Sequence, residues 1–228
     1  MCEIQQKLKS VLIAQGASLV GFADLRPVWK GSLKTGVSVA LPLPREVVRS
    51  LPNGPVPRYY DAYCRLNGRL DRIVTAGAEY LKAEGYHAFA QTAGAVNESE
   101  DYRTELPHKT VATRSGLGWI GKCALLVTPE YGSAVRLSSI LTDAPVRCGV
   151  PIAQSRCGSC TAGADVCPGK AVSGKVWSAG VDRNDFFNPY ACRKAARALA
   201  RERIQREITL CGRCIAACPY TKRYLAEK

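Results

Sequence analysis

The sequence predicts an α+β fold, in which a mixed helix-and-strand part is followed by a basic part rich in cysteine. The first part, residues 1–146, holds segments with the apolar periodicity of both helices and strands. Residues 148–218 hold eight of the 11 cysteines. The charge is also unequal, because residues 1–146 carry 17 basic and 13 acidic side chains while residues 147–228 carry 15 and 6. We therefore predict two domains, residues 1–146 and residues 147–228.

The first domain is expected to combine helices with short strands. Apolar residues share one helical face over residues 4–12, and Gly16 is a suitable stop for that helix. Over residues 58–84, apolar and aromatic residues recur at intervals of three and four, which predicts a long helix. Strands are expected over residues 19–25, 37–41, 86–91, 125–128 and 135–142.

The composition is that of a folded protein with two unusual features. Of the 228 residues 46% are hydrophobic and 22% charged, which excludes a disordered chain, and no apolar run reaches the ~18 residues of a membrane span. The N-terminus has acidic and amide residues where a secretion signal is basic and apolar, so we expect a cytoplasmic protein with no membrane partner. Eleven cysteines in that reducing compartment indicate metal binding. The net charge of +13 indicates an acidic partner or simply a basic surface.

Two related cysteine motifs dominate the second domain. The first reads CGSCTAGADVCP and the second CGRCIAACP, and both end in Cys-Pro. Bacterial two-cluster ferredoxins use C-x2-C-x2-C-x3-C-P, where the last cysteine of each run ligates the other cluster. Zinc is the competing metal, but zinc sites do not require Cys-Pro. We therefore predict two iron–sulfur clusters, with a ligand set of Cys157, Cys160, Cys167, Cys192, Cys211, Cys214 and Cys218.

One cluster is predicted to lack a ligand. We call the exchange of the last cysteine between the two clusters the crossed rule. By this rule, one [4Fe–4S] site is completed by Cys167, Cys192, Cys211 and Cys214, whereas three cysteines remain for the other: Cys157, Cys160 and Cys218. The position where a ferredoxin has its missing cysteine is Gly163. Three explanations stay open: a [3Fe–4S] cluster, a fourth iron that carries a non-cysteine ligand or substrate, or a spare cysteine, of which Cys148 is the nearest in sequence.

Residues 108–143 read HKTVATRSGLGWIGKCALLVTPEYGSAVRLSSILTD. With the two cysteine motifs in the same order and at similar separations, this segment resembles the epoxyqueuosine reductase family. These are cobalamin-dependent enzymes that reduce an epoxide on a modified tRNA base. The layout is similar, more distantly, to reductive dehalogenases. The resemblance covers about residues 100–225. It implies a nitroreductase-like or cobalamin-reductase-like α/β cofactor-binding domain over residues 1–146 and a ferredoxin-like two-cluster module over residues 147–228.

The resemblance also implies a cofactor beside the GLGWIGK segment, with cobalamin the first choice and flavin the second. Glycines there would let backbone amides approach a large flat ligand closely, and basic side chains would meet its polar edge. A glycine-rich turn packed for structural reasons, with its tryptophan in the core, is the alternative. The expected cofactor-binding residues are Arg114, Gly116, Gly118, Trp119, Gly121 and Lys122.

The sequence departs from the family at two places. Gln91 stands where members carry an aspartate proton donor, and an amide cannot supply a proton as a carboxylic acid does. Glu98, Glu100, Asp101 and His108 are possible substitutes, and none is selected, so no catalytic residue is assigned. The sequence also ends ten residues after Cys218, and we do not expect it to hold the tRNA-binding repeats of longer members. Epoxyqueuosine reduction itself is therefore not expected.

These observations favour an epoxyqueuosine reductase-like iron–sulfur oxidoreductase. It would take electrons from a ferredoxin or flavodoxin and pass them through two clusters to a corrinoid or flavin and a small substrate. One alternative is an electron-transfer protein that reactivates a partner corrinoid protein. Another is a reductase linked to tRNA modification, although nucleic acid is not the expected partner because few aromatic residues interleave with the arginines of residues 193–206.

Overall fold

The structure is a computed structural model that describes residues 2–226, and the chain packs as two compact units. The first unit combines the chain up to Leu41 with residues 66–117 and 136–152. The second combines residues 42–65 and 118–135 with the chain from Ala153 onward. Packing therefore groups several segments into each unit, and the division of the sequence after residue 146 remains a prediction.

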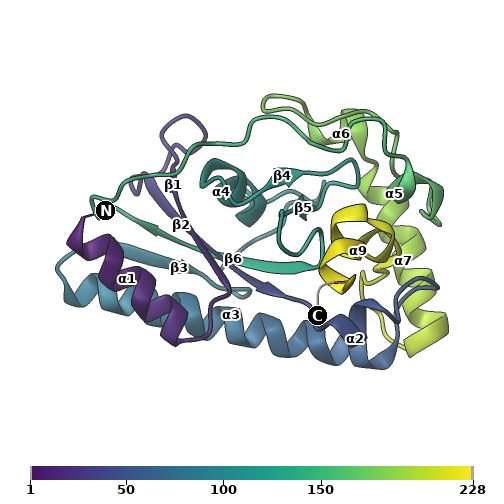
Figure 1. Ribbon diagram of the computed structural model, residues 1–228, viewed down its shortest axis with the longest axis horizontal. Helices are drawn as coiled ribbons and strands as arrows, with labels where there is room; N and C mark the ends of the chain where they lie inside the picture. Colours follow the sequence, from purple (N-terminus) through teal and green to yellow (C-terminus); the bar gives the residue numbers. More distant parts are fainter. Residues whose placement is uncertain (1, 227–228) are drawn as a thin grey trace. The chain divides into compact units, whose positions relative to one another are not determined.

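The first unit is built on a four-stranded sheet within the described residues, with strand order β1-β2-β6-β3 (Figure 1). Strands β1 and β2 pair antiparallel, as do β3 and β6, where Gln91 lies opposite Ser139. The strands are β1 (Leu19–Asp24), β2 (Thr35–Pro42), β3 (Ala88–Gln91) and β6 (Val135–Thr142). All four strands were expected from the apolar pattern, and β6 has the expected bounds.

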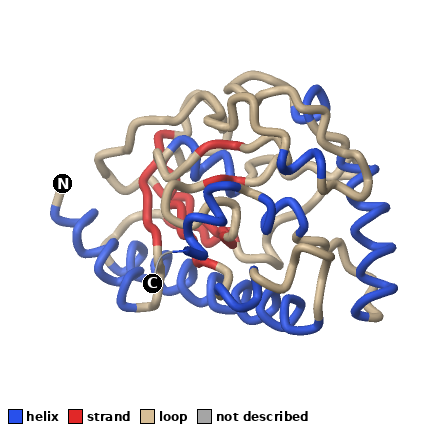
Figure 2. Tube along the Cα trace, turned by 45° about the vertical axis from the view of Figure 1, so that its right-hand side comes forward, coloured by secondary structure: helices blue, strands red, loops and turns tan. Residues whose placement is uncertain are grey.

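Helices cover both faces of this sheet. Helices α1 (Glu3–Ala14) and α3 (Pro57–Ala83) lie on one face (Figures 1 and 2). They meet at Gly77, where an added Cβ would lie 2.7 Å from side-chain atoms of both Leu12 and Ile140. The absence of a side chain at Gly77 therefore lets these elements pack closely.

The opposite face is covered by α4 (His108–Arg114). Its Val111 is buried in a cluster with Ala23, Leu25, Leu106 and Leu141. Neighbours Ile140 and Leu141 thus pack on opposite faces of β6, as the alternation of a strand requires. No helix was expected over the residues of α4, and burial of Val111 against the sheet explains why they form one.

The described residues of the second unit form helices joined by long loops, together with a short hairpin. Helix α7 begins where the Asn188 side chain accepts a hydrogen bond from the Ala191 amide, with Pro189 in its first turn. The helices wholly within this unit are α2 (Arg45–Val48), α5 (Ala162–Asp165), α6 (Arg183–Phe186), α7 (Pro189–Ile204), α8 (Arg213–Ala217) and α9 (Pro219–Ala226). None of the helices in residues 2–226 has both the length and the apolar character that a membrane span requires.

The hairpin pairs β4 (Trp119–Ile120) with β5 (Leu126–Val127). Gly118 enters it against the partner strand, since a Cβ there would lie 2.2 Å from the Val127 carbonyl oxygen. Trp119 is fully buried and packs edge-on against Tyr220, with ring centroids 4.8 Å apart. The hairpin is thereby fixed to α9 inside the second unit.

Candidate metal centre

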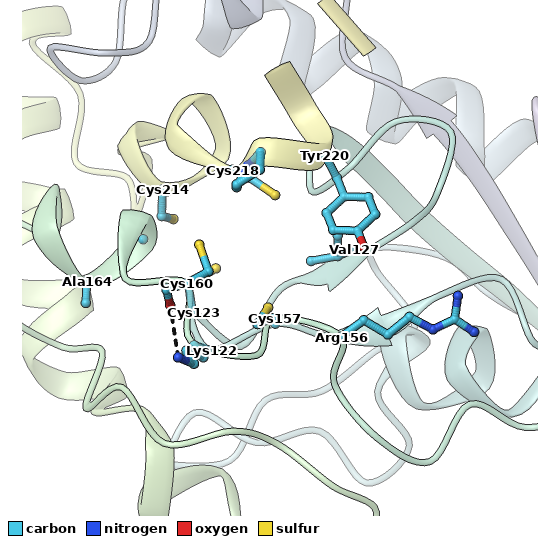
Figure 3. A pocket seen from close by; sticks show the side chains of 13 residues that line it. Lys122, Cys123, Val127, Arg156, Cys157, Cys160, Ala164, Cys214, Cys218 and Tyr220 are labelled. Carbon is cyan, nitrogen blue, oxygen red and sulfur yellow. Dashed lines mark hydrogen bonds between the residues drawn. The ribbon is translucent and has the colours of Figure 1, made fainter. Parts of the chain in front are cut away.

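Cysteines gather around one pocket in the second unit (Figure 3). Within the part of the chain that the structure describes, thirteen residues line this pocket and five of them are cysteines. Its volume is about 540 Å³, including space open to solvent. The cysteines come from the hairpin, from the first motif and from the second motif: Cys123, Cys157, Cys160, Cys214 and Cys218.

The second motif places its cysteines through two short helices. Gly212 lies between Cys211 and Cys214 and is the N-cap residue of α8. Its φ of +85° is the left-handed conformation that glycine adopts readily. Cys218 is extended between α8 and α9, as the residue before a proline usually is, and Pro219 opens α9. The Cys-Pro pair therefore separates Cys218 from the helix that carries Cys214.

A second group of cysteines lies close together in the same unit. Burial, followed by the neighbours Cys167 and Cys211, raises the pKa of the Cys192 thiol to about 11. Burial is also the main cause that raises the pKa of Cys211. The Ala171 amide donates a hydrogen bond to the Cys167 sulfur at 3.3 Å. These three cysteines belong to the set expected for the complete cluster.

The arrangement suits a cluster that several thiolates surround. Figure 3 shows the five pocket cysteines distributed around a common space. Among residues 2–226, no group of three or more His, Cys, Asp or Glu side chains is gathered closely enough to hold a single metal ion. The pocket therefore offers thiolates from three segments of the chain to one space, as a polynuclear cluster requires.

The pocket contains a cysteine that the motif analysis did not assign. Cys123 follows the GLGWIGK segment directly, and its hydrogen bond to Cys214, together with burial, raises the pKa of the Cys214 thiol well above its usual value. Cys148, the spare cysteine nearest in sequence, belongs to the first unit. The sequence feature that could have pointed to Cys123 is its position just before the strand expected over residues 125–128.

The expected cofactor-loop residues divide between the units. Arg114 and Gly116 belong to the first, where the Arg114 guanidinium donates to the Asp24 carbonyl oxygen and Gly116 has a φ of +82°. The other four, Gly118, Trp119, Gly121 and Lys122, belong to the second unit.

Within the second unit, these residues have partners in the protein itself. Gly118 adjoins the Val127 backbone and Trp119 is in the core. The Lys122 ammonium donates to the Cys160 carbonyl oxygen at 2.9 Å. These contacts supply a structural reason for the glycine-rich segment, and a role in cofactor binding remains a prediction.

Gln91 belongs to a buried polar chain in the first unit. Its Oε1 accepts a hydrogen bond from the Ser139 hydroxyl at 2.5 Å, and His108 Nδ1 lies 2.8 Å from the same hydroxyl oxygen. Because the single hydroxyl proton goes to Gln91, the network assigns the Nδ1 proton to His108. Burial, then the nearby Arg136, lowers the pKa of His108 to about 4, so the ring is neutral at pH 7.

Comparison with known proteins agrees with this description. Residues 156–221 match a family described as a 4Fe-4S double cluster binding domain. The epoxyqueuosine reductase of Bacillus anthracis is 33% identical over 124 residues, which cover 52% of this chain and 30% of that protein. The Bacillus subtilis epoxyqueuosine reductase is 42% identical over 79 residues, covering 32% of this chain and 20% of that protein.

Over about half of its length, the chain is similar to epoxyqueuosine reductases. A selenomethionine-labelled epoxyqueuosine reductase has the same fold, with a TM-score of 0.65 and 21% identity over 96% of this chain and 66% of that one. The catabolic reductive dehalogenase NpRdhA also shares it, with a TM-score of 0.74 and 18% identity over 94% of this chain and 31% of that one. The chain spans about 30% of the length of the first curated relatives that it matches.

Proposed function

We propose that this chain is an iron–sulfur oxidoreductase of the epoxyqueuosine reductase type, working in the cytoplasm. The observation that carries the proposal is the pocket lined by five cysteines, four of which lie in the segment, residues 156–221, that matches a double-cluster domain. When bound, the two clusters supply one-electron transfer. Electrons would come from a ferredoxin or flavodoxin.

The chain's own residues would hold the clusters and tune them. The cysteines supply thiolates, and the Ala171 amide donates to one of them, Cys167. Hydrogen bonds to sulfur and limited solvent access set the potential of such sites. The Lys122 ammonium is also held close to the pocket through the Cys160 carbonyl, which supports the same function by placing a positive charge beside an anionic site.

The electron acceptor would be a corrinoid, with flavin second. One solved neighbour is described as a reductive dehalogenase whose structure suggests a mechanism for B12-dependent dehalogenation, with a TM-score of 0.72. For the substrate, the named relatives support a modified nucleoside of tRNA over a small free molecule. We therefore place the tRNA-linked alternative first, although the sequence alone favoured a small substrate.

The arginines in and just after helix α7 make contacts within the second unit. Arg197 and Arg201 both pair with Glu207, and the Arg206 guanidinium stacks over Tyr60 at 5.3 Å. Arg203 donates to the Pro55 carbonyl at 3.3 Å. These arginines have partners within the unit, so we assign no phosphate-binding role to α7.

The cluster proposal is tested by analysing anaerobically purified protein for iron, acid-labile sulfide and zinc. We expect about eight iron and eight sulfide per chain. Cys64→Ser is the matched control, because Cys64 is exposed and does not line the pocket. Stoichiometric zinc with little sulfide would overturn the proposal. Visible spectra with and without added hydroxocobalamin or flavin identify the second cofactor.

The substrate proposal is tested in cells that lack their own epoxyqueuosine reductase. The wild-type chain should lower the ratio of epoxyqueuosine to queuosine in tRNA hydrolysates, measured by mass spectrometry. Cys218→Ser, which removes a pocket thiolate, should not. An unchanged ratio with wild-type protein that carries both clusters would reject tRNA as substrate. Reduction of a Co(II) corrinoid protein in the same preparation would then select the reactivating role.

A further inference from the structure

The tip of the β4–β5 hairpin projects Cys123 from a tightly defined turn. The Ala124 amide donates to the Gly121 carbonyl at 2.9 Å, and the Gly121 amide donates to the Leu125 carbonyl at 2.8 Å. Ala124 has a φ of +58°, the left-handed conformation that follows the turn in a three-residue hairpin loop. Cys123 therefore sits at a fixed position between two antiparallel strands.

This tip lies against the first cysteine motif. The Lys122 ammonium donates to the Cys160 carbonyl at 2.9 Å. A Cβ added at Gly121 would lie 3.6 Å from the Cys157 sulfur. Gly121 and Lys122, which directly precede Cys123, thus lie beside the two cysteines of the CGSC segment, which are expected to share one cluster.

Cys123 also lies beside the position from which a ligand is missing. A Cβ built on Gly163 would lie 3.9 Å from the Cys123 Cβ and 4.0 Å from the Cys214 Cβ, at ordinary contact distance. A cysteine at position 163 would therefore occupy space next to the Cys123 side chain. The chain has glycine where the ferredoxin motif has cysteine, and a cysteine from the hairpin adjoins the same place.

The other cysteines are less suitable as the fourth ligand. Cys2, Cys64 and Cys148 are not among the residues that line the pocket, and Cys64 is exposed on α3. Cys214 lines the pocket, but the crossed rule places it in the cluster with Cys167, Cys192 and Cys211, which already has four thiolates.

We propose that Cys123 is the fourth thiolate ligand of the cluster held by Cys157, Cys160 and Cys218, in place of the cysteine missing at Gly163. This inference rests on the cluster binding proposed above. On binding, the Cys123 thiol releases its proton to solvent and its sulfur forms a bond to the fourth iron, from which a water or hydroxide leaves. No oxidation state changes in this exchange, and the cluster becomes a complete [4Fe–4S] centre.

The test compares four anaerobically purified proteins: wild type, Cys123→Ala, the double variant Cys123→Ala/Gly163→Cys, and Cys64→Ala as the matched control. Each is briefly oxidised and then measured for iron, sulfide and the paramagnetic resonance signal of a three-iron cluster. We expect Cys123→Ala to fall from about eight to about seven iron per chain and to gain the three-iron signal. The double variant should return to about eight iron without that signal, and Cys64→Ala should match wild type.

Two results would overturn the inference. One is a Cys123→Ala protein that keeps its full iron content and shows no three-iron signal. The other is a double variant that remains deficient in iron, because Cys123 would then act through the hairpin fold and not as a ligand. If Cys123→Ala loses both clusters, the double variant still decides the question, because recovery of its iron content shows that a thiolate at this place is what the single variant lacks. Wild-type protein without sulfide would instead refute the proposed function, before any Cys123 variant is compared.

Discussion

The Lys122 ammonium donates a hydrogen bond to the Cys160 carbonyl oxygen over 2.9 Å, and this contact ties the tip of the β4–β5 hairpin to the first cysteine motif. A hydrogen bond from a charged donor contributes about 1.5–3 kcal/mol when it is withdrawn from solvent. We expect Lys122→Met to keep the fold and to loosen this attachment. Iron should then pass to a chelator roughly tenfold faster, followed by loss of the cluster absorbance. Lys175→Met, which changes an exposed lysine, is the control, and equal rates in the two variants would contradict the expectation.

Gly118 is expected to be required for the hairpin whether or not a flat cofactor binds. A Cβ at this position would lie 2.2 Å from the Val127 carbonyl oxygen. Because that oxygen belongs to the backbone, rotation of a side chain cannot relieve the clash. Gly118→Ala should therefore destabilise the protein by at least about 2 kcal/mol, measured by denaturant unfolding. Gly94→Ala serves as the control, since nothing lies within 4 Å of an added Cβ there. A stable Gly118→Ala protein that has lost only cofactor affinity would instead support the close approach of a ligand.

His108 should titrate with a midpoint of about 4, because burial and then Arg136 disfavour its charged form. In the unfolded chain this histidine has a pKa near 6.5, so as the pH falls it binds its proton at a higher pH than in the folded chain. Stability is thus fully present above about pH 6.5, declines as the pH falls towards 4, and loses up to about 3 kcal/mol in that window. Nuclear magnetic resonance measures the midpoint from the change in chemical shift of the His108 ring protons with pH. The His108 signal is identified as the one that is absent from a His108→Gln variant. A midpoint near 6.5 would show that the ring is solvated.

Ser139 joins Gln91 to His108, so its removal should affect both partners. Ser139→Ala deletes a hydroxyl that donates to Gln91 Oε1 and accepts from His108 Nδ1. Two buried polar atoms then lack this partner, and we expect a loss of about 1–3 kcal/mol in unfolding free energy. Ser99→Ala is an exposed control with a comparable side-chain contact. Similar stabilities of the two variants would mean that the buried chain is not maintained by this hydroxyl.

Much of the fold was predictable because its elements carry their own local pattern. Strand β6 alternates and ends in a fully buried run, and α3 shows the three-and-four spacing of a helix buried on one side. Helix α4 was missed because it has seven residues and no side-chain cap, so burial of Val111 against the sheet decides its conformation. Strand β4 has two residues, too few for a periodic signal.

The candidate site was predictable only where its ligands are close in sequence. Motif spacing identifies Cys157 with Cys160 and Cys211 with Cys214, because a tight turn brings such pairs together. Cys123 reaches the same pocket through the packing of a hairpin against a distant loop, and spacing carries no information about that contact. Whether Cys148, which is nearer in sequence to the first motif, serves as a ligand stays a prediction.

The pocket draws thiols from segments that a ribosome makes at well-separated times. Cys157 and Cys218 are 61 positions apart, and both line the same space. A nascent chain therefore exposes the first thiols to oxidants and stray metals while the last are still unsynthesised. The cluster expected on Cys157, Cys160 and Cys218 can therefore be completed only after translation has passed Cys218, so the yield of intact recombinant protein should depend on the supply of assembled clusters at that late moment more than on the rate of synthesis.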